Sequence, residues 1–460
     1  MLDTALLKEA LQVPMALGAL EEFTDVTTDS RAIVPGCLFV ALKGERFDGH
    51  RFVAQALQEG ARAAVVSEVP EGVPADRCIQ VDDTLEAYQK IASCWRLKQK
   101  GLTVIAITGS NGKTSTKDCI AAVLGEKYRV IKTQANFNNE IGLPKTLLTI
   151  REDTEMAVVE MGMRGLGQIR AMKHIAFPDA AVITNVGDTH LELLGSLENI
   201  AKAKSEILED FTPKNHVFLN GDDPRVSVME TGATVHTYGI DSDADVKAVE
   251  ITADGLATRF VYRSRITGNT QAVKLPLLGR HNVMNALAAV AVGEVYGVPD
   301  EAIAQGLENL KMTGMRQEIL HFGPVTVIND AYNASPASME AALKTLGDVV
   351  KDQGKGRAIA VLADMLELGA HSRSGHTQVG EWCGKYGVDA LLCYGPESRY
   401  TAEAAEKAGV PVHYVENKEA AAPVLERLVR PDDVVLLKGS HGMEVFSLID
   451  TVFRKGAKTC

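Results

Sequence analysis

Short apolar runs alternate with longer amphipathic segments along most of the chain. In the first hundred residues, β-like runs such as Cys37–Leu42 and Ala63–Ser67 stand between helical stretches. The alternation recurs after residue 101 and again after residue 313. Apolar runs between longer amphipathic segments are typical of parallel α/β sheets. The strands predicted in these two later blocks are Thr103–Thr108, Met156–Glu160, Ala180–Asn185, Val217–Asn220, Val325–Asn329, Ala358–Leu362, Ala390–Tyr394 and Val434–Lys438.

Changes in this pattern divide the chain into three predicted α/β domains. The polar segment Leu97–Gly101 is interpreted as a linker, and an alanine-rich helix opens at about His281. A chain of 460 residues is too long for a single core and suggests about three domains. We predict a first α/β domain at 1–100, a central parallel-sheet domain at 101–312, and a Rossmann-like C-terminal domain at 313–460.

Composition and charge exclude several classes of protein. Apolar residues make up 46% and charged residues 23%, as in ordinary globular chains. The formal net charge of −12 argues against a general nucleic-acid or anionic-membrane surface. The start of the chain lacks a signal-peptide pattern, and no apolar run approaches the roughly 20 residues of a membrane span. Seven scattered cysteines without CxxC spacing argue against a zinc site or a disulfide framework. We therefore expect a soluble, cytoplasmic protein.

The segment GSNGKT, from Gly109 to Thr114, stands between a predicted strand and a predicted helix. Two glycines permit a sharp turn, and the N–H groups of the following helix start favour a phosphate. Lys113 would reach the terminal phosphates, and the Thr114 hydroxyl would bind Mg²⁺. The general P-loop pattern has a further glycine where this chain has Ile107. The segment alone therefore also allows an ordinary glycine turn with a solvated lysine.

Two residues after later strands are candidate metal ligands. Glu160 ends an apolar strand, at the edge where an α/β sheet presents its ligands. A carboxylate there suits Mg²⁺, which prefers oxygen ligands. His190 follows the next strand and should reach the same edge, although a histidine standing alone there would be taken for a surface-loop residue.

The helical segment around Lys204 places this lysine on an apolar face. Its neighbours at offsets of −4, +3 and +4 are Ile200, Ile207 and Leu208. Lys202 instead shares the polar face with Glu206. An ammonium on the apolar side is costly unless it is paired or chemically altered, but its stem can also snorkel along the surface. Helical spacing alone leaves both interpretations open.

Seven segments stand in a fixed order along the chain: TGSNGKT, TQANFNNEIGLP, VVEMG, NVGDTHLELLG, AKAKSEI, GRHNVMNALAA and LLKGSHG. Together they resemble the Mur ligases, the cytoplasmic ATP-dependent enzymes that add amino acids to the peptidoglycan precursor. With Asp29-Ser-Arg31 near the start and Lys438-Gly-Ser440 near the end, the resemblance covers nearly the whole chain. The phosphate loop of this family has the short GxxGKT form, which accounts for Ile107.

Within this family, the chain resembles the ligases that join D-alanyl-D-alanine to UDP-N-acetylmuramoyl-tripeptide. The segments that carry this resemblance are YNASP (Tyr332–Pro336) and VLADMLELG (Val361–Gly369). The DYAHTPDAL and DNPR motifs of the ligases that add the third residue are missing from the chain. One departure is His441, which stands where the family often has an arginine. The resemblance implies ligation by a monomer, through an acyl phosphate and a tetrahedral intermediate. It also implies that the first domain binds the UDP precursor, that the central domain binds ATP, and that the C-terminal domain closes over ATP and binds the incoming dipeptide.

The resemblance also implies site residues, position by position. For ATP they are Gly109, Ser110, Asn111, Gly112, Lys113, Thr114, Ser115, His281, Asn282, Asn285, Arg316 and Asp330. For two Mg²⁺ ions they are Thr114, Glu160, His190 and a carbamylated Lys204. For the UDP precursor and the dipeptide they are Ser30, Arg31, Lys43, Asp48, His50, Asn136, Asn138, Asn139, Tyr332, Asn333 and Ser335. Catalytic roles are implied for Lys113, His190, Lys204 and Arg316.

Other functions compete with the ligase. Folylpolyglutamate synthase shares the acyl-phosphate chemistry and a related phosphate loop, but it lacks a first domain of this kind and the YNASP segment. A nucleotide-dependent switch would use the phosphate loop, yet it would not need a second metal ligand such as Lys204. A catalytically idle scaffold is disfavoured because every expected catalytic position is filled. We favour the ligase.

Overall fold

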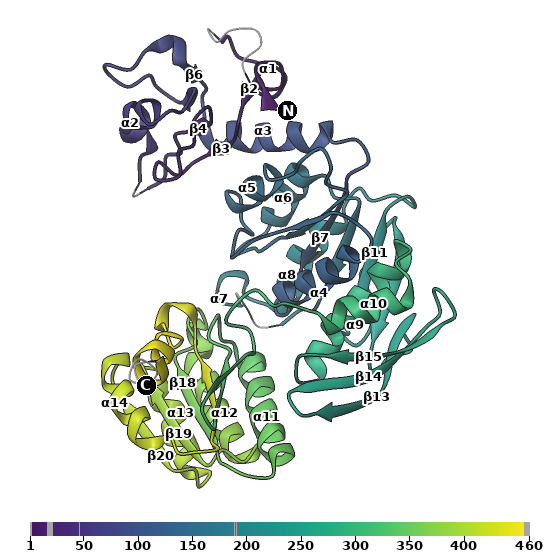
Figure 1. The fold of residues 1–460 in the computed structure, drawn as a ribbon, viewed down its shortest axis with the longest axis vertical. Helices are drawn as coiled ribbons and strands as arrows, with labels where there is room; N and C mark the ends of the chain where they lie inside the picture. Colours follow the sequence, from purple (N-terminus) through teal and green to yellow (C-terminus); the bar gives the residue numbers. More distant parts are fainter. Residues whose placement is uncertain (1, 16–21, 46, 188, 190, 455–460) are drawn as a thin grey trace.

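Three β-sheets, each with its own helices, follow one another along the long axis of the molecule (Figure 1). The computed structural model describes residues 2–15, 22–45, 47–187, 189 and 191–454. Within these residues a four-stranded sheet is followed by a nine-stranded and then a six-stranded sheet. The α/β class predicted from the alternating pattern is confirmed. No helix of the described residues is long and apolar enough to cross a membrane.

The N-terminal sheet is small and parallel. Its order is β3 (Val26–Thr27), β4 (Leu38–Val40), β5 (Ala63–Val66) and β6 (Cys78–Gln80). The 3₁₀ turn η1 (Gly49–Phe52) leads into α2 (Val53–Gln58), which packs beside β5. A separate ribbon of β1 (Leu2–Asp3) and β2 (Glu22–Phe23) lies beside α1 (Thr4–Leu11).

Helix α3 (Thr84–Lys98) joins the N-terminal sheet to the central one (Figure 1). The Trp95 indole N–H donates to the Ile150 carbonyl at 3.2 Å, and the Arg96 guanidinium donates to the Ala176 carbonyl at 3.0 Å. Because these contacts hold the last turn of the helix, it continues to Lys98. The predicted linker is therefore wrong in its first two residues, which are helical.

The central sheet carries the phosphate loop. Its order is β15 (Thr270–Leu275), β14 (Ala257–Ser264), β13 (Val246–Asp254), β12 (Thr234–Gly239), β11 (His216–Asn220), β10 (Ala180–Ile183), β7 (Thr103–Thr108), β9 (Met156–Glu160) and β8 (Val130–Lys132). The strands from β8 to β13 are parallel, whereas β13, β14 and β15 pair antiparallel. The predicted parallel sheet is confirmed for β8 to β13, and the antiparallel extension was not predicted.

The antiparallel extension has a different sequence pattern from the parallel strands. In β13 and β15, buried positions alternate with exposed or half-exposed ones, whereas β9 and β10 are buried throughout. Antiparallel strands with one face exposed to solvent have alternating apolar and polar residues. Parallel strands that are covered on both faces have continuous apolar runs. Continuous runs were the basis of the strand predictions, so the alternating strands were missed.

Helices cover both faces of the central sheet. On one face α4 (Lys113–Gly125), α9 (Arg280–Val295) and α10 (Asp300–Glu308) share a core with Ile105 and Ile107 of β7. On the other face Val104 and Ala106 of the same strand point into a second core. The helices of that second core are α3, α5 (Gly142–Leu147), α6 (Gln168–Ala176) and α8 (Leu197–Ser205), and the short α7 (Leu191–Leu194) precedes α8.

The C-terminal sheet has six strands, and only its first strand is antiparallel to its neighbour. Its order is β16 (Glu318–Phe322), β17 (Val325–Asn329), β21 (Val434–Lys438), β18 (Ala358–Ala363), β19 (Ala390–Tyr394) and β20 (Val412–Val415). One face is covered by α11 (Pro336–Gln353), α12 (Ser372–Lys385) and α13 (Ser398–Lys407). The other is covered by α14 (Lys418–Leu428) and the π-helix Ile449–Arg454.

Candidate active site

The phosphate loop joins the end of β7 to the start of α4, as the sequence predicted. Gly112 has a φ of 79°, in the left-handed region that favours glycine. A Cβ at Gly112 would lie 2.7 Å from Asn285 Oδ1, and a Cβ at Gly109 would overlap Thr184 Oγ1. Both glycines are therefore required by close approach of neighbouring side chains.

We expect Gly109→Ala to raise the KM for ATP, because its methyl group would displace the loop. The closest overlap is with the Thr184 hydroxyl, whereas the Thr184 Cβ would lie 3.0 Å away, so the double variant Gly109→Ala/Thr184→Ala should recover only part of the affinity. Thr184→Ala alone is the matched control, and steady-state kinetics against ATP measures all three. A Gly109→Ala variant with an unchanged KM would show that the loop does not approach the nucleotide.

The loop is held in place by the residues that follow β10. Thr184 Oγ1 and Asn185 Nδ2 both donate to the Asn111 carbonyl, at 2.7 and 3.0 Å. The Asn111 N–H donates to Asn185 Oδ1 at 2.8 Å. Ser110 Oγ accepts from the Gly187 N–H at 2.8 Å. The loop conformation is thus fixed by its neighbours before any ligand binds.

Lys113 folds back over the loop. Its Nζ donates to the Gly109 carbonyl at 2.8 Å and to the Ser110 carbonyl at 3.2 Å. Loss of water around the ammonium lowers the pKa of Lys113 from its ordinary value, and the charge of Glu160 opposes this shift. The Lys113 amine thus has two neutral carbonyl partners and lies beside the loop, where it could bind an anion.

Glu160 is a buried carboxylate beside the loop, at the end of β9. Thr114 Oγ1 donates to its Oε2 at 2.7 Å, and Asn138 Nδ2 donates to its Oε1 at 2.9 Å. Its backbone N–H donates to Thr133 Oγ1 at 3.0 Å. The structure thus brings together Thr114 and Glu160, predicted as metal ligands, and Asn138, predicted to hold substrate.

Lys204 is 2% exposed, on the buried side of α8. Its neighbours at the predicted offsets are buried as well: Ile200, Ile207 and Leu208. Within the described part of the chain, Lys204 has no hydrogen bond or ion pair, and burial lowers its pKa well below the ordinary value, with the nearby charge of Lys113 adding to the effect. Burial therefore disfavours the charged ammonium form of this side chain.

The face opposite Lys204 was predicted only in part. Lys202 is exposed, as expected. Glu206 is buried instead of solvated, because its carboxylate accepts the backbone N–H groups of Gly167 and Arg170 at 2.6 and 3.1 Å. It caps the start of α6, where free N–H groups attract an anion.

His190, predicted as a metal ligand, lies outside the described residues. Among the residues that the structure does describe, no three or more His, Cys, Asp or Glu side chains are grouped so that they could hold a metal ion. Beside Glu160, the described residues offer a divalent cation an oxygen ligand of another kind, the Thr114 hydroxyl.

A chain of side-chain amides runs from α4 to the segment before β16. Asn285 Oδ1 accepts from Thr116 Oγ1 at 3.1 Å, and Asn285 Nδ2 donates to Asn282 Oδ1 at 3.2 Å. Asn282 Nδ2 then donates to Gln317 Oε1 at 2.7 Å, and Gln317 Nε2 lies 3.1 Å from His281 Nε2. Sequence reasoning missed Gln317, although it follows the predicted Arg316 directly.

The C-terminal part contributes Arg316 and the residues after β17. The guanidinium carbon of Arg316 lies 3.5 Å from the centre of the Tyr332 ring, and its Nη1 is buried without a hydrogen-bond partner in the described structure. Asp330 Oδ2 accepts from Lys438 Nζ at 2.6 Å. Ser335 Oγ donates to Asn111 Oδ1 at 3.2 Å, so the C-terminal part touches the phosphate loop directly. Lys438 appeared in the sequence only as part of a motif.

His441, the departure from the family pattern, lies beside two aromatic rings. Its ring centre lies 5.7 Å from that of Tyr332, with the two rings tilted by 44°, and 5.6 Å from that of Phe446, on which it stacks. His441 and Arg316 therefore both contact Tyr332.

The residues predicted to hold the UDP precursor are engaged in local turns. His50 is buried, with Nδ1 2.7 Å from Asp48 Oδ1 and Nε2 accepting the Ser67 backbone N–H at 2.9 Å. The exposed Arg31 pairs with Asp29, and this contact lowers the pKa of that carboxyl. These turns belong to the N-terminal part, at the top of Figure 1, away from the phosphate loop.

The other predicted substrate residues are dispersed. Asn139 Oδ1 accepts the Gly142 N–H at 2.9 Å and so helps to start α5. Asn333 Oδ1 accepts the Ala334 N–H at 2.9 Å. Lys43 and Asn136 are exposed, whereas Ser30 and Ser115 are half-buried. Their roles toward substrate stay predictions.

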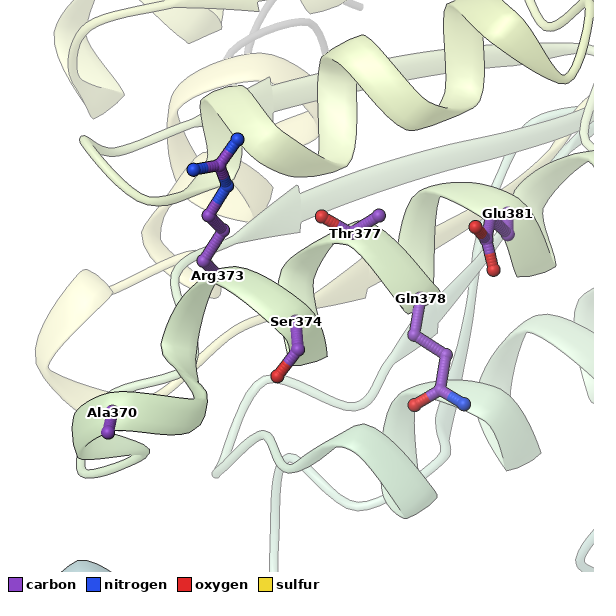
Figure 2. Close-up of a pocket in the computed structure, with 6 residues that line it drawn as sticks. All are labelled: Ala370, Arg373, Ser374, Thr377, Gln378 and Glu381. Carbon is purple, nitrogen blue, oxygen red and sulfur yellow. The ribbon is translucent and has the colours of Figure 1, made fainter.

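A pocket of about 640 Å³ lies elsewhere, along η4 (Gly369–His371) and α12. Figure 2 shows the six side chains that line it, all from this one stretch of the C-terminal part: Ala370, Arg373, Ser374, Thr377, Gln378 and Glu381. It contains none of the predicted site residues. We therefore take as the candidate active site the group of residues around the phosphate loop rather than this pocket.

Three family models match the chain in succession. They are described as Mur ligase family, catalytic domain, at residues 22–96, Mur ligase middle domain, at 107–293, and Mur ligase, glutamate ligase domain, at 315–441. The UDP-N-acetylmuramoyl-tripeptide--D-alanyl-D-alanine ligase of Bacillus subtilis is 42% identical over 430 residues, which are 92% of this chain and 92% of that protein. The chain belongs to the Mur ligase family.

Solved structures of Mur ligases have the same fold. MurF from Acinetobacter baumannii superposes on this Mur ligase with a TM-score of 0.88 at 31% identity, covering 98% of this chain and 99% of that chain. MurF from Thermotoga maritima, in complex with ADP, gives a TM-score of 0.82 at 27% identity, covering 95% and 98%. The resemblance carried by the seven sequence segments is thereby confirmed.

Proposed function

We propose that this Mur ligase joins D-alanyl-D-alanine to UDP-N-acetylmuramoyl-tripeptide at the expense of ATP. The products are the UDP-N-acetylmuramoyl-pentapeptide, ADP and phosphate, in peptidoglycan biosynthesis. The observation that carries this proposal is the 42% identity, across nearly all of both chains, to a relative that bears this name. Such identity over the full length favours the ligase over folylpolyglutamate synthase and over a nucleotide switch.

The first step activates a poor electrophile. The terminal carboxylate of the tripeptide attacks the γ-phosphorus of ATP, an acyl phosphate forms, and ADP leaves. Lys113 lies where its ammonium can neutralise charge that develops on the transferred group. The unpaired Nη1 of Arg316 is a second donor available to the phosphates.

The second step forms the peptide bond. The amine of D-alanyl-D-alanine attacks the acyl carbon, a tetrahedral intermediate forms, and phosphate leaves as the amide is made. Because water would also attack an acyl phosphate, the site must be closed during this step. The hydrogen bond from Ser335 to Asn111 supports a role of the C-terminal part in that closure.

The donor groups around Glu160 suit Mg²⁺. A buried carboxylate held by a hydroxyl and an amide offers oxygen to a hard cation that takes few protein ligands and keeps its phosphate and water ligands. We assign Thr114 and Glu160 to one ion, together with His190, and Lys204 to a second. When bound, Mg²⁺ would supply charge neutralisation for the phosphoryl group.

Carbamylation accounts for the environment of Lys204. A neutral, buried amine can add CO₂ and lose a proton, giving a carbamate whose oxygens are anionic. This replaces an isolated cation, which burial disfavours, by an oxygen ligand for the second Mg²⁺. The nucleotide base would then lie toward Asn282 and Asn285, with the ribose near Asp330. We further propose a cytoplasmic monomer.

The test is phosphate release from ATP in parallel reactions. All contain UDP-N-acetylmuramoyl-tripeptide, and they differ in the acceptor: D-alanyl-D-alanine, single L-amino acids, or none. We expect release that depends on both the precursor and the dipeptide, with the pentapeptide product detected by mass. Release that is indifferent to the dipeptide would remove the ligase assignment.

A further inference from the structure

The segment from Thr313 to Gln317, here called the strap, joins the central part to the C-terminal part. It lies between α10, which ends at Glu308, and β16, which begins at Glu318. At its start, the Thr313 backbone N–H donates to Asp118 Oδ2 at 2.7 Å, and Thr313 Oγ1 donates to Asp118 Oδ1 at 3.0 Å. One carboxylate thus holds both the backbone and the side chain of the first strap residue.

Asp118 belongs to a buried ionic cluster that the proposed chemistry does not use. Both Asp118 and Lys117 are 0% exposed. Lys132 Nζ donates to Asp118 Oδ1 at 2.7 Å, and Lys117 Nζ lies 3.4 Å from the same oxygen. Lys117 also donates to the Thr133 carbonyl at 2.8 Å. Buried charges are costly unless they are paired, and loss of one partner leaves the others uncompensated. Asp118, Lys117 and Lys132 can therefore change position little without losing these contacts.

The same cluster is directly connected to the phosphate site. Asp118 and Lys117 stand on α4, about one turn after Lys113 and Thr114. The Thr133 carbonyl accepts a hydrogen bond from Lys117 Nζ, and the Thr133 hydroxyl accepts one from the Glu160 backbone N–H. The helix that presents the phosphate loop therefore also carries the anchor of the strap.

The far end of the strap is fixed to the C-terminal part. The Tyr332 N–H donates to the Met315 carbonyl at 3.2 Å, and the Gln317 N–H donates to Asp330 Oδ1 at 3.3 Å. Met315 and Gln317 have φ angles of 61° and 49°, which side chains other than glycine rarely adopt unless their surroundings impose them. Arg316 stands between these two residues, so its direction follows from how the strap is held.

We infer that Asp118 is a positioning residue: by holding Thr313 it fixes the strap to the phosphate-loop helix and so sets where Arg316 meets the ATP phosphates. This inference rests on the proposed function. The phosphate loop and the proposed base-side residues Asn282 and Asn285 do not belong to the strap, so a loosened strap should change nucleotide affinity less than it slows the reaction. Transfer and ligation need Arg316 and the C-terminal part in one place, so these steps slow, and acyl phosphate is lost to water.

Thr313→Val tests the anchor with little change in shape. It keeps the backbone N–H and removes the hydroxyl that bonds Asp118 and lies 3.4 Å from Lys117 Nζ. We expect the kcat of ligation to fall roughly tenfold, as misplaced groups do, with the KM for ATP changed less than about twofold. The phosphate released per pentapeptide should rise above the wild-type ratio. Thr313→Ser restores the hydroxyl and should restore both quantities.

The matched control is Thr345→Val, which removes a hydroxyl bonded only to the Ala341 carbonyl of its own helix α11. Wild-type kcat and phosphate ratio in Thr313→Val would overturn the inference. An equal loss in Thr345→Val, or no recovery in Thr313→Ser, would also overturn it, because the effect would then be one of general stability. A wild-type protein without dipeptide-dependent turnover would instead defeat the proposed function.

Hydrogen exchange tests the contact between Asp118 and Thr313 without any substrate. The Thr313 amide should exchange slowly in the wild-type protein, because a buried carboxylate accepts it, and faster in Asp118→Asn, where a neutral acceptor replaces the charged one. Thr345→Val should leave the rate unchanged. Surface-like exchange at Thr313 in the wild-type protein would overturn the inference whatever the reaction proves to be.

Discussion

We expect Lys113→Met to lower the kcat of ligation by about 10³-fold, the loss typical of removing one preorganised charge-stabilising donor. The ammonium of Lys113 bonds the carbonyls of Gly109 and Ser110, which are weak partners for a desolvated cation. A phosphate in the loop is a stronger partner, because it is charged and several N–H groups converge on it. Methionine keeps the length of the side chain and removes only its charge and its donors.

Lys127→Met is the control for this variant. Lys127 Nζ also donates to two backbone carbonyls, those of Tyr296 and Gly297, but on the surface at the other end of α4. We expect its kcat to stay within about twofold of wild type, as for surface substitutions in general. Phosphate release and pentapeptide formation are followed for both variants. Equal activity of Lys113→Met and Lys127→Met would place the phosphates elsewhere.

Much of the fold follows from local sequence. Strands such as β7, β9 and β17 are continuous apolar runs with both faces covered, and their predicted bounds agree with the structure. The phosphate loop was predictable because two glycines, a lysine and a threonine carry one chemistry over six residues. Lys204 was placed on the buried side of its helix correctly, since helical periodicity alone decides which face a residue takes.

Contacts between distant segments were not predictable in the same way. Glu206 shares the polar face of its helix with Lys202, yet its carboxylate is buried. It accepts two backbone N–H groups at the start of α6, and this contact is not visible in the local sequence. Asp118 and its partner Thr313 are 195 positions apart, so nothing near Asp118 in the sequence indicates this contact. Gln317 likewise acquires its role from Asn282 of α9. Such residues are polar positions whose partners are chosen by the tertiary fold.

Lys204 gives the second prediction with a large expected effect. Its amine is buried, has no partner in the described part of the chain, and its pKa lies well below the ordinary value because of desolvation. A neutral amine at neutral pH is nucleophilic toward CO₂, whereas an ammonium is not. The carbamate would supply the anionic oxygens that a second Mg²⁺ requires, so loss of Lys204 should remove that ion together with most of the activity.

Lys204→Ala should therefore lose about 10²–10³-fold in kcat, the range for removal of one group that stabilises transferred charge. A short carboxylate such as acetate, or bicarbonate, should restore part of the activity by filling the vacated space with anionic oxygens. Lys202→Ala, two positions earlier on the exposed side of α8, is the matched control and should behave as wild type with or without the added anion. Removing CO₂ from the buffers should slow the wild-type enzyme alone. Full activity of Lys204→Ala would exclude a required carbamate, because this variant has no amine to which CO₂ could add.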